Sequence, residues 1–333
     1  MLVNSAFTGH GAGVRHVEGF FRMDRLVTLF GGGGFLGRYV AQELLRGGAR
    51  VRIAERDPRD AWFVKPLGGL GQTQFVHADI TRPDSAARAV AGSHAVVNLV
   101  GILKGDFTRV HEKGAENVAV AAAGADAQAL VQVSAIGADE RSASAYGRSK
   151  ARGEAAVRGT FPAATIIRPS LLFGPEDRFV NRLANLIRTL PVVPVIRPEM
   201  RVQPAYVVDV ARAIAAAALD PEAHGGRTYE LGGPEILTMR ALHAWIAAET
   251  GRERPLVDLP DCAAAFIARF GWLPGAPMTW DQWQMLQADN VVHEDMPGFG
   301  AFGVAPAPLA AVAPTWLFRY RRYGRFATPR TTA

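Results

Sequence analysis

The chain has 333 residues, of which 49% are hydrophobic and 20% are charged, with a formal net charge of +6. This balance is typical of a folded globular protein and excludes a largely disordered chain, and no apolar run approaches the roughly 18 residues that a membrane-spanning helix needs. A single cysteine, Cys262, excludes an internal disulfide and a cysteine-rich metal site, and the basic residues follow no nucleic-acid-binding motif, so we expect neither a metal ion nor a nucleic-acid partner.

The first 22 residues differ from the rest of the chain. They lack both the basic start and the sustained apolar stretch of a signal peptide, and Met23 stands just before the first strand-like run. We therefore expect residues 1–22 to form a disordered extension, or to result from a misplaced start.

Short apolar runs then alternate with helical patterns. The predicted strands are Leu26–Phe30, Arg50–Ala54, Thr73–Val76, Ala95–Val100, Leu130–Ser134 and Thr165–Arg168. The predicted helices are Phe35–Arg46, Asp84–Ala91, Arg109–Ala123 and Tyr146–Thr160. Strands that are apolar throughout and separated by helices indicate a parallel sheet covered on both faces. We predict an α/β fold of the Rossmann type, a doubly wound parallel sheet with a smaller C-terminal lobe.

Beyond Arg168, prolines and glycines interrupt the pattern. Helices are predicted at Arg178–Leu190, Val207–Leu219, Met239–Thr250 and Thr279–Ala288, and order is expected in the tail after Pro297 only near Trp316–Tyr323. The aromatic residues Trp272, Trp280 and Trp283 are predicted to lie in the core of the smaller lobe. We assign residues 24–180 to the nucleotide-binding domain, completed by about 203–235. Residues 181–202 and 236–325 form the smaller substrate or partner lobe.

A glycine-rich loop joins the first strand to the first helix. It contains Gly31, Gly33, Gly34, Phe35, Leu36 and Gly37, with Arg38 following. Its glycines fit the spacing that allows a sharp turn and lets a pyrophosphate reach backbone N–H groups at a helix N-terminus. No Gly-Lys-Ser/Thr follows, which excludes a P-loop. The loop predicts that the protein binds a nicotinamide dinucleotide.

The end of the second strand bears on which dinucleotide is bound. Glu55 there would bind the ribose 2′-hydroxyl of NAD(H), whereas Arg56, helped by Arg38, would accept the 2′-phosphate of NADP(H). We favour NADP(H), and NAD(H) stays as the alternative. Further cofactor contacts are expected at later strand ends, from Asp79, Ile80, Asn98, Val100 and Gly101.

A tyrosine and a lysine four residues apart open the helix after the fifth strand. Tyr146 and Lys150 share one helix face, and Ser134 ends the preceding strand. A neighbouring ammonium would lower the pKa of the phenol from about 10, which would let Tyr146 exchange a proton with a substrate oxygen held by Ser134. Tyr146 and Lys150 are also predicted to bind the cofactor.

Together these motifs resemble the extended or atypical branch of the short-chain dehydrogenase/reductase superfamily. The segment Arg168, Pro169 and Ser170, followed by residues 173–179, resembles the part of that branch that approaches the nicotinamide. Residues 30–39, 96–101, 146–154 and 203–210 resemble the subfamily of accessory subunit nine of the alpha subcomplex of respiratory complex I and its bacterial homologues. In that subfamily an arginine occupies the place of Arg56, which implies NADP(H).

The resemblance implies an accessory or assembly role at respiratory complex I or in ubiquinone biosynthesis, with the cofactor held for structure. The alternative is an active NADP-dependent oxidoreductase or epimerase that acts on a small or lipophilic carbonyl or alcohol and uses Ser134, Tyr146 and Lys150. We expect a cytoplasmic protein, peripheral at the cytoplasmic membrane. Basic residues with interleaved aromatic residues at positions 316–325 are the predicted contact for an acidic partner or anionic lipid.

Overall fold

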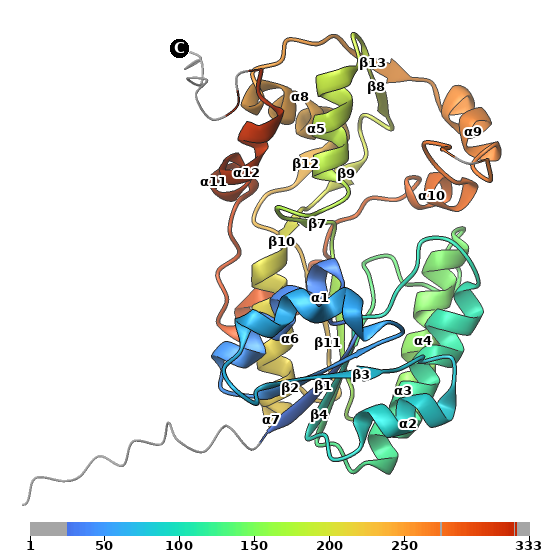
Figure 1. Ribbon diagram of the computed structural model, residues 1–333. Coiled ribbons are helices and arrows are strands. Elements are labelled where there is room, and N and C mark those ends of the chain that lie inside the picture. Colours follow the sequence, from blue (N-terminus) through green and yellow to red (C-terminus); the bar gives the residue numbers. More distant parts are fainter. Residues whose placement is uncertain (1–24, 274, 323, 325–333) are drawn as a thin grey trace, which may run out of the picture.

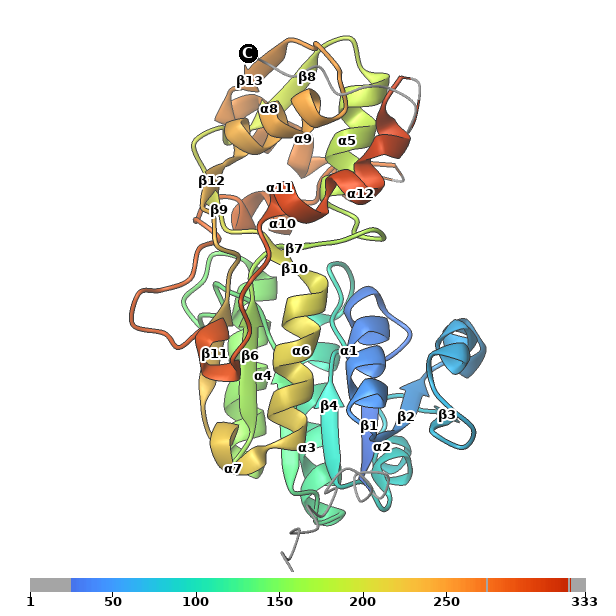
Figure 2. The same cartoon turned by 90° about the vertical axis from the view of Figure 1, so that its left-hand side faces the viewer.

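The computed structural model describes residues 25–273, 275–322 and 324. The predicted extension at residues 1–22 lies outside the described residues, as do Tyr323 and the basic end of the chain at 325–333. In the described part, a larger α/β body carries a smaller lobe at one end of its sheet (Figures 1 and 2).

The body is built on a seven-stranded sheet. Its strands are β1 (Leu26–Phe30), β2 (Arg50–Glu55), β3 (Thr73–His77), β4 (Ala95–Asn98), β5 (Ala129–Val133), β6 (Thr165–Pro169) and β11 (Thr228–Leu231). They follow the order β11-β6-β5-β4-β1-β2-β3, and every pair is parallel. This order confirms the predicted Rossmann-type fold, in which ligands bind beyond the carboxyl ends of the strands where the order reverses.

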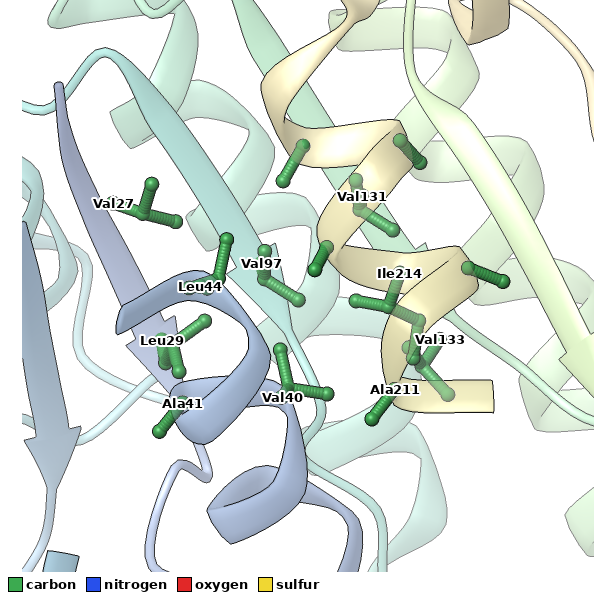
Figure 3. Packing of buried hydrophobic residues seen from close by; sticks show 14 of the residues in the cluster. Val27, Leu29, Val40, Ala41, Leu44, Val97, Val131, Val133, Ala211 and Ile214 are labelled. Carbon is green, nitrogen blue, oxygen red and sulfur yellow. The ribbon is translucent and has the colours of Figure 1, made fainter. Parts of the chain in front are cut away.

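Helices cover both faces of the sheet. On one face α1 (Phe35–Arg46) and α6 (Val207–Leu219) pack side by side, and on the other lie α2 (Pro83–Val90), α3 (Gly114–Gly124) and α4 (Ala145–Thr160). Figure 3 shows the first face, where Leu29 of β1 and Val97 of β4 pack beneath Val40 of α1 and Ile214 of α6. Each fully buried aliphatic side chain contributes about 1.5–3 kcal/mol, so this interface fixes the sheet and the loops at its carboxyl edge.

Most boundaries in the body differ from the prediction by at most one residue, and the larger or more informative differences lie at β4, β5 and α3. Strand β4 ends at Asn98, because the Asn98 side chain accepts the Val100 N–H (3.1 Å) and turns the chain out of the ladder. Strand β5 ends at Val133, so Ser134 follows it. The helix predicted at 109–123 begins as a π-helical turn, Thr108–Lys113, before α3. The 3-10 helix Pro58–Leu67 (η3) and strand β11 were not predicted.

The smaller lobe has its own core, formed mainly by α5 (Val180–Thr189), α8 (Met239–Glu249) and α12 (Pro314–Leu317). Its short strands are β8 (Val193–Ile196) with β13 (Leu256–Leu259) and β9 (Arg201–Val202) with β12 (Leu237–Thr238), and β7 (Leu172–Phe173) with β10 (Ala205–Tyr206) joins it to the body. The other short elements are α7 (Pro221–His224), η5 (Phe299–Phe302), α11 (Leu309–Val312) and η6 (Phe318–Tyr320). Helices α9 (Asp261–Arg269) and α10 (Trp280–Met285) form a small projecting unit (Figure 1).

The tail after Pro297 is more ordered than predicted. Phe299 packs into the core of the body, and Asp209 of α6 accepts the Ala307 N–H (2.8 Å). Trp316 and Leu317 are buried in the core of the smaller lobe. These contacts tie the tail to both parts of the protein.

The arginines of the tail hold it in place. Arg319 donates to the Pro175 carbonyl, and Arg321 donates to the Glu249 carbonyl and pairs with its carboxylate. Both guanidinium groups thus use some of their N–H donors within the fold, and the contact with an acidic partner or lipid stays a prediction.

Candidate functional site

The glycine loop lies at the carboxyl end of β1. Gly31 has a φ of +81°, a conformation that glycine adopts without strain, and its Cα packs against Leu99. A Cβ on Gly37 would lie 2.2 Å from the Gly31 carbonyl oxygen, so only glycine allows α1 to pack this closely. Gly34 caps α1 without any side-chain hydrogen bond.

This loop fits a phosphate group. The first turn of α1, which includes Phe35 and Leu36, presents N–H groups that have no carbonyl partner within the helix, and its positive end faces outward from the sheet edge. A Cβ on Gly34 would meet only the Gly31 oxygen, at 3.2 Å, so the space above this residue is open. The loop therefore has the features of a pyrophosphate cradle.

The acid and the arginine at the end of β2 differ in their availability. The Glu55 carboxylate accepts the Gly33 N–H at 2.7 Å, and burial raises the pKa of this carboxyl. Arg56 is exposed, and its guanidinium has no hydrogen-bond partner among the described residues. Arg38 stacks over the Phe63 ring at 4.5 Å, and its buried Nε has no described partner. Arg38 also pairs with Glu176 at 3.7 Å, so Arg56 is the more available cation beside the carboxylate that binds the loop.

The polar side chains at the ends of β3 and β4 form hydrogen bonds with neighbouring parts of the chain. The Asn98 amide donates to Gln132 (2.9 Å), so its side chain bridges two strands and the turn at Val100. The Asp79 carboxylate accepts from the Thr81 N–H (2.9 Å) and hydroxyl (2.8 Å). These side chains shape the crevice edge through their own hydrogen bonds.

Two further predicted residues lie at the same edge. Ile80 is buried, with its side chain against Gly114 of α3, and its carbonyl accepts from Asn117 (2.8 Å). A Cβ on Gly101 would lie 3.3 Å from the Lys150 Nζ. The turn after β4 and the lysine of α4 are therefore brought together.

The Ser134, Tyr146 and Lys150 set converges at the end of β5. Lys150 Nζ lies 5.8 Å from the centroid of the Tyr146 ring and donates to the Val133 carbonyl at 3.3 Å. Ser134 is the next residue, and its buried Oγ has no hydrogen-bond partner among the described residues. Because buried hydroxyls are nearly always hydrogen-bonded, this Oγ is available to a bound molecule.

The expected effect of Lys150 on the tyrosine is wrong. Burial raises the pKa of Tyr146 to about 12, and burial lowers the pKa of Lys150 to about 8. Desolvation is the first cause of both shifts, and the ammonium does not lower the pKa of the phenol. Tyr146 therefore carries its proton at neutral pH and is suited to donate it to a substrate oxygen.

His111, which the sequence did not single out for the site, contacts Tyr146. Its ring is edge-on to the Tyr146 ring, with centroids 5.3 Å apart. Its Nε2 accepts the Ile102 N–H (2.9 Å), so Nδ1 carries the proton and donates to Ser149 (2.8 Å), whose hydroxyl donates to the Tyr146 carbonyl (2.8 Å). Burial, followed by the charge of Lys150, lowers the pKa of His111 to about 3, so the imidazole stays neutral.

The segment predicted to approach the nicotinamide is largely occupied by its own contacts. Arg168 binds both oxygens of Glu154 (2.9 and 2.7 Å) and also contacts Glu230 (3.3 Å). The Ser170 hydroxyl donates to the Asn290 side chain at 2.7 Å. The backbone is engaged as well, because the Pro169 carbonyl accepts the Ile136 N–H (3.2 Å) and the Ser170 N–H donates to the Leu231 carbonyl (2.9 Å), so direct cofactor contact from this segment stays a prediction.

The smaller lobe caps the helix that carries the tyrosine. Asp281 of α10 accepts the Ala145 N–H (2.6 Å), the Tyr146 N–H (3.3 Å) and the Ser144 hydroxyl (3.0 Å). A carboxylate at a helix N-terminus satisfies free N–H groups and complements the helix dipole. Asp281 therefore fixes the first turn of α4 against the smaller lobe.

Asp281→Ala is expected to lower the free energy of unfolding by about 1–2 kcal/mol, because the Ala145 and Tyr146 N–H groups lose their acceptor while the N-cap Ser144 still serves Gly147. Urea unfolding measures this loss. The control is Asp295→Ala, which removes an exposed carboxylate that has no described partner. An equal, small effect of both substitutions would contradict the capping role.

Among the residues that the structure describes, no group of three or more His, Cys, Asp or Glu side chains is arranged to hold a metal ion. No described helix combines the length and apolar character needed to cross a membrane.

Comparison with known proteins identifies the family. A model for the NAD dependent epimerase/dehydratase family matches residues 27–232. The chain is 36% identical over 331 residues to NADH dehydrogenase (ubiquinone) 1 alpha subcomplex subunit 9, mitochondrial, of Mus musculus, with 96% of this chain and 86% of that protein covered. It is 34% identical over 306 residues to a ceramide reductase of Caulobacter vibrioides, with 87% and 89% covered.

A solved structure shows the same fold. It is that of an NADPH-dependent quinone oxidoreductase from Escherichia coli complexed with NADPH, with a TM-score of 0.72, 18% identity, and 88% of this chain and 99% of that chain covered. The comparisons confirm the predicted resemblance to the short-chain dehydrogenase/reductase superfamily and to complex I subunit nine, and they support an NAD(P) cofactor.

Proposed function

We propose that this chain, which belongs to the NAD dependent epimerase/dehydratase family, holds NADP(H) on its glycine loop and serves as an accessory or assembly factor of respiratory complex I. The observation that carries this proposal is similarity to a complex I subunit over 96% of the chain, which includes the smaller lobe as well as the nucleotide-binding body. Proteins of ubiquinone biosynthesis are the second class of partner. The proposed location is the cytoplasm, at the cytoplasmic membrane.

In this role the cofactor stabilises a docking surface. A ligand that binds only the folded state stabilises it by about 2.7 kcal/mol at a hundredfold excess over its Kd. The candidate site supports such coupling, because Asp281 links α4, which carries Tyr146 and Lys150, directly to the smaller lobe. Cofactor binding would thereby hold the smaller lobe in the arrangement that a partner recognises.

The preference for NADP(H) rests on Arg56. Its guanidinium has no described partner and can form a charge-assisted hydrogen bond with a 2′-phosphate. The carboxylate of Glu55, which would otherwise bind a ribose 2′-hydroxyl, already accepts the Gly33 N–H at 2.7 Å. Arg38 supplies a second positive charge beside the same strand end.

Arg56→Ala is expected to weaken NADPH binding by roughly 10–30-fold, the effect of losing one or two charge-assisted hydrogen bonds, and to leave NADH binding nearly unchanged. Calorimetric titration with NADPH and with NADH measures the change in affinity for each dinucleotide. Arg50→Ala, at the opposite end of the same strand, is the control. Equal or tighter binding of NADH by the unmodified protein would contradict the assignment.

The second candidate function is reduction of a lipophilic carbonyl. The buried Oγ of Ser134, which has no described partner, favours it, as does similarity to a ceramide reductase over 87% of the chain. A bound nicotinamide would supply a hydride to the carbonyl carbon. The protonated Tyr146 would donate its proton to the carbonyl oxygen, Ser134 would hydrogen-bond the same oxygen, and Lys150 would hold the cofactor ribose.

Tyr146→Phe separates the two functions. In a deletion strain with a respiratory or quinone defect, the variant is expected to restore growth as the unmodified protein does, because a docking role does not need the phenol proton. Tyr229→Phe, which removes a buried hydroxyl that bonds His224 away from the site, is the control for folding. Failure of Tyr146→Phe alone, with NADPH binding intact, would favour the reductase.

A further inference from the structure

The projecting α9–α10 unit exposes a group of large apolar side chains. They are Phe266 (65% exposed), Phe270 (44%), Trp272 (71%), Leu273 (42%) and Trp280 (41%), and we call them the aromatic face. The sequence-based expectation that the tryptophans lie in the core is confirmed for Trp283 and wrong for Trp272 and Trp280. Large apolar side chains that are exposed along one short segment, with Phe266 against Phe270 and Arg269 over Trp280, are typical of a contact site rather than of ordinary surface variation.

The aromatic face is not needed to hold the unit together. The core of the unit is formed by Ala264, Ala268, Met278 and Trp283, which are all buried. On the outer side, Phe266 and Phe270 contact each other with ring centroids 5.2 Å apart. The exposed aromatic side chains are therefore additional to the buried core of the unit.

The segment that carries the aromatic face contains few charged side chains, and its charge is positive. From Phe266 to Trp280 the sequence contains one charged residue, Arg269, whose guanidinium lies 5.7 Å from the centroid of the Trp280 ring. An arginine beside tryptophan is suited to the boundary between lipid headgroups and acyl chains, where the ring enters the apolar region and the cation contacts phosphate. The chain as a whole carries a net charge of +6, which also favours an anionic surface.

We propose that the aromatic face docks the protein on a lipid bilayer that contains anionic headgroups, with Phe266, Trp272 and Trp280 inserted at the interface and Arg269 bound to phosphate. This inference is independent of the cofactor and of any complex I contact. A protein partner would form roughly one hydrogen bond per 100–200 Å² of interface, and this stretch has few side-chain donors or acceptors to supply them. A bilayer surface needs no such matching.

The position of the unit fits this role. Figure 1 shows α9 and α10 projecting from the side of the smaller lobe, above the part of the body that contains α4. Insertion of interfacial elements by about 5–10 Å is typical, which the aromatic side chains span. Since Asp281 of α10 caps α4, docking also brings the helix that carries Tyr146 close to the membrane.

The test is flotation of the full-length protein with protein-free vesicles of phosphatidylcholine and phosphatidylglycerol. The unmodified protein is expected to bind, and a Phe266→Gln/Trp272→Gln variant is expected to lose at least about tenfold in partition coefficient. Both side chains are mostly exposed, so folding is preserved, and NADPH binding is measured in parallel. The control, Leu70→Gln/Val120→Gln, removes exposed apolar side chains of the body and should bind vesicles normally.

Arg269→Ala should weaken binding to anionic vesicles about fivefold and leave binding to pure phosphatidylcholine unchanged. Three outcomes would overturn the proposal. The first is no binding of the unmodified protein to protein-free vesicles. The second is equal binding by the Phe266→Gln/Trp272→Gln variant. The third is association only with native membranes, abolished by protease treatment of those membranes, which would assign the aromatic face to a protein partner.

Discussion

Gly34→Val is expected to reduce NADPH affinity at least about a hundredfold while the protein stays folded. Gly34 has φ −71° and ψ 178°, which valine adopts without strain, and a Cβ there would meet only the Gly31 oxygen at 3.2 Å. The branched side chain would therefore point into the open space above the N-terminus of α1. A pyrophosphate could then no longer reach the N–H groups of the first turn.

Fluorescence titration with NADPH measures the loss, and circular dichroism checks the fold. Gly159→Val is the matched control, because Gly159 lies exposed on α4 with open space around its Cα and the same side chain there should leave affinity unchanged. The neighbouring Gly37 is unsuitable for this test, since its Cβ would lie 2.2 Å from a backbone oxygen and disturb the fold itself. Unchanged NADPH affinity in Gly34→Val would place the cofactor elsewhere.

The sequence predicts the sheet and the glycine loop well for a physical reason. Strands such as Leu26–Phe30 and Ala129–Val133 are buried along their whole length, so apolar runs mark them directly. The loop positions depend on local geometry, because each glycine either turns the chain or allows a close approach. The shared face of Tyr146 and Lys150 likewise follows from helical spacing alone.

Other features depend on partners far away in the chain. Strand β11 contains the buried Glu230. A glutamate predicts a surface position from sequence alone, and its burial depends on the pairing with Arg168 and His293. His111 lies in a π-helical turn, and hydrophobic periodicity does not predict such a turn. From this position the ring of His111 contacts that of Tyr146. Trp272 was assigned to the core because aromatic residues are usually buried, and only its surroundings reveal that it is exposed.

Lys150→Met is expected to stabilise the cofactor-free protein at pH 7 by about 2–3 kcal/mol and at the same time to weaken NADPH binding. Burial lowers the pKa of Lys150 from 10.5 to about 8, so the fold pays a penalty for the ammonium at neutral pH. Methionine has a similar length and carries no charge. The Val133 carbonyl, which accepts from Lys150, keeps a second donor in Gln132 (3.2 Å).

The pH dependence distinguishes this penalty from a packing effect. Between pH 8 and 10.5 the unfolded chain binds the lysine proton and the folded chain releases it, so the stability that Lys150 removes is recovered as the pH rises through this range. The advantage of Lys150→Met in urea unfolding should therefore be full below pH 8 and shrink toward pH 10.5. Lys113→Met, which removes an exposed lysine paired with Glu116, should show no such trend. A Lys150→Met variant that is less stable than the unmodified protein at pH 7 would mean that the buried ammonium is compensated in the fold. In that case Lys150 would not destabilise the cofactor-free protein, and cofactor binding would have no such destabilisation to offset.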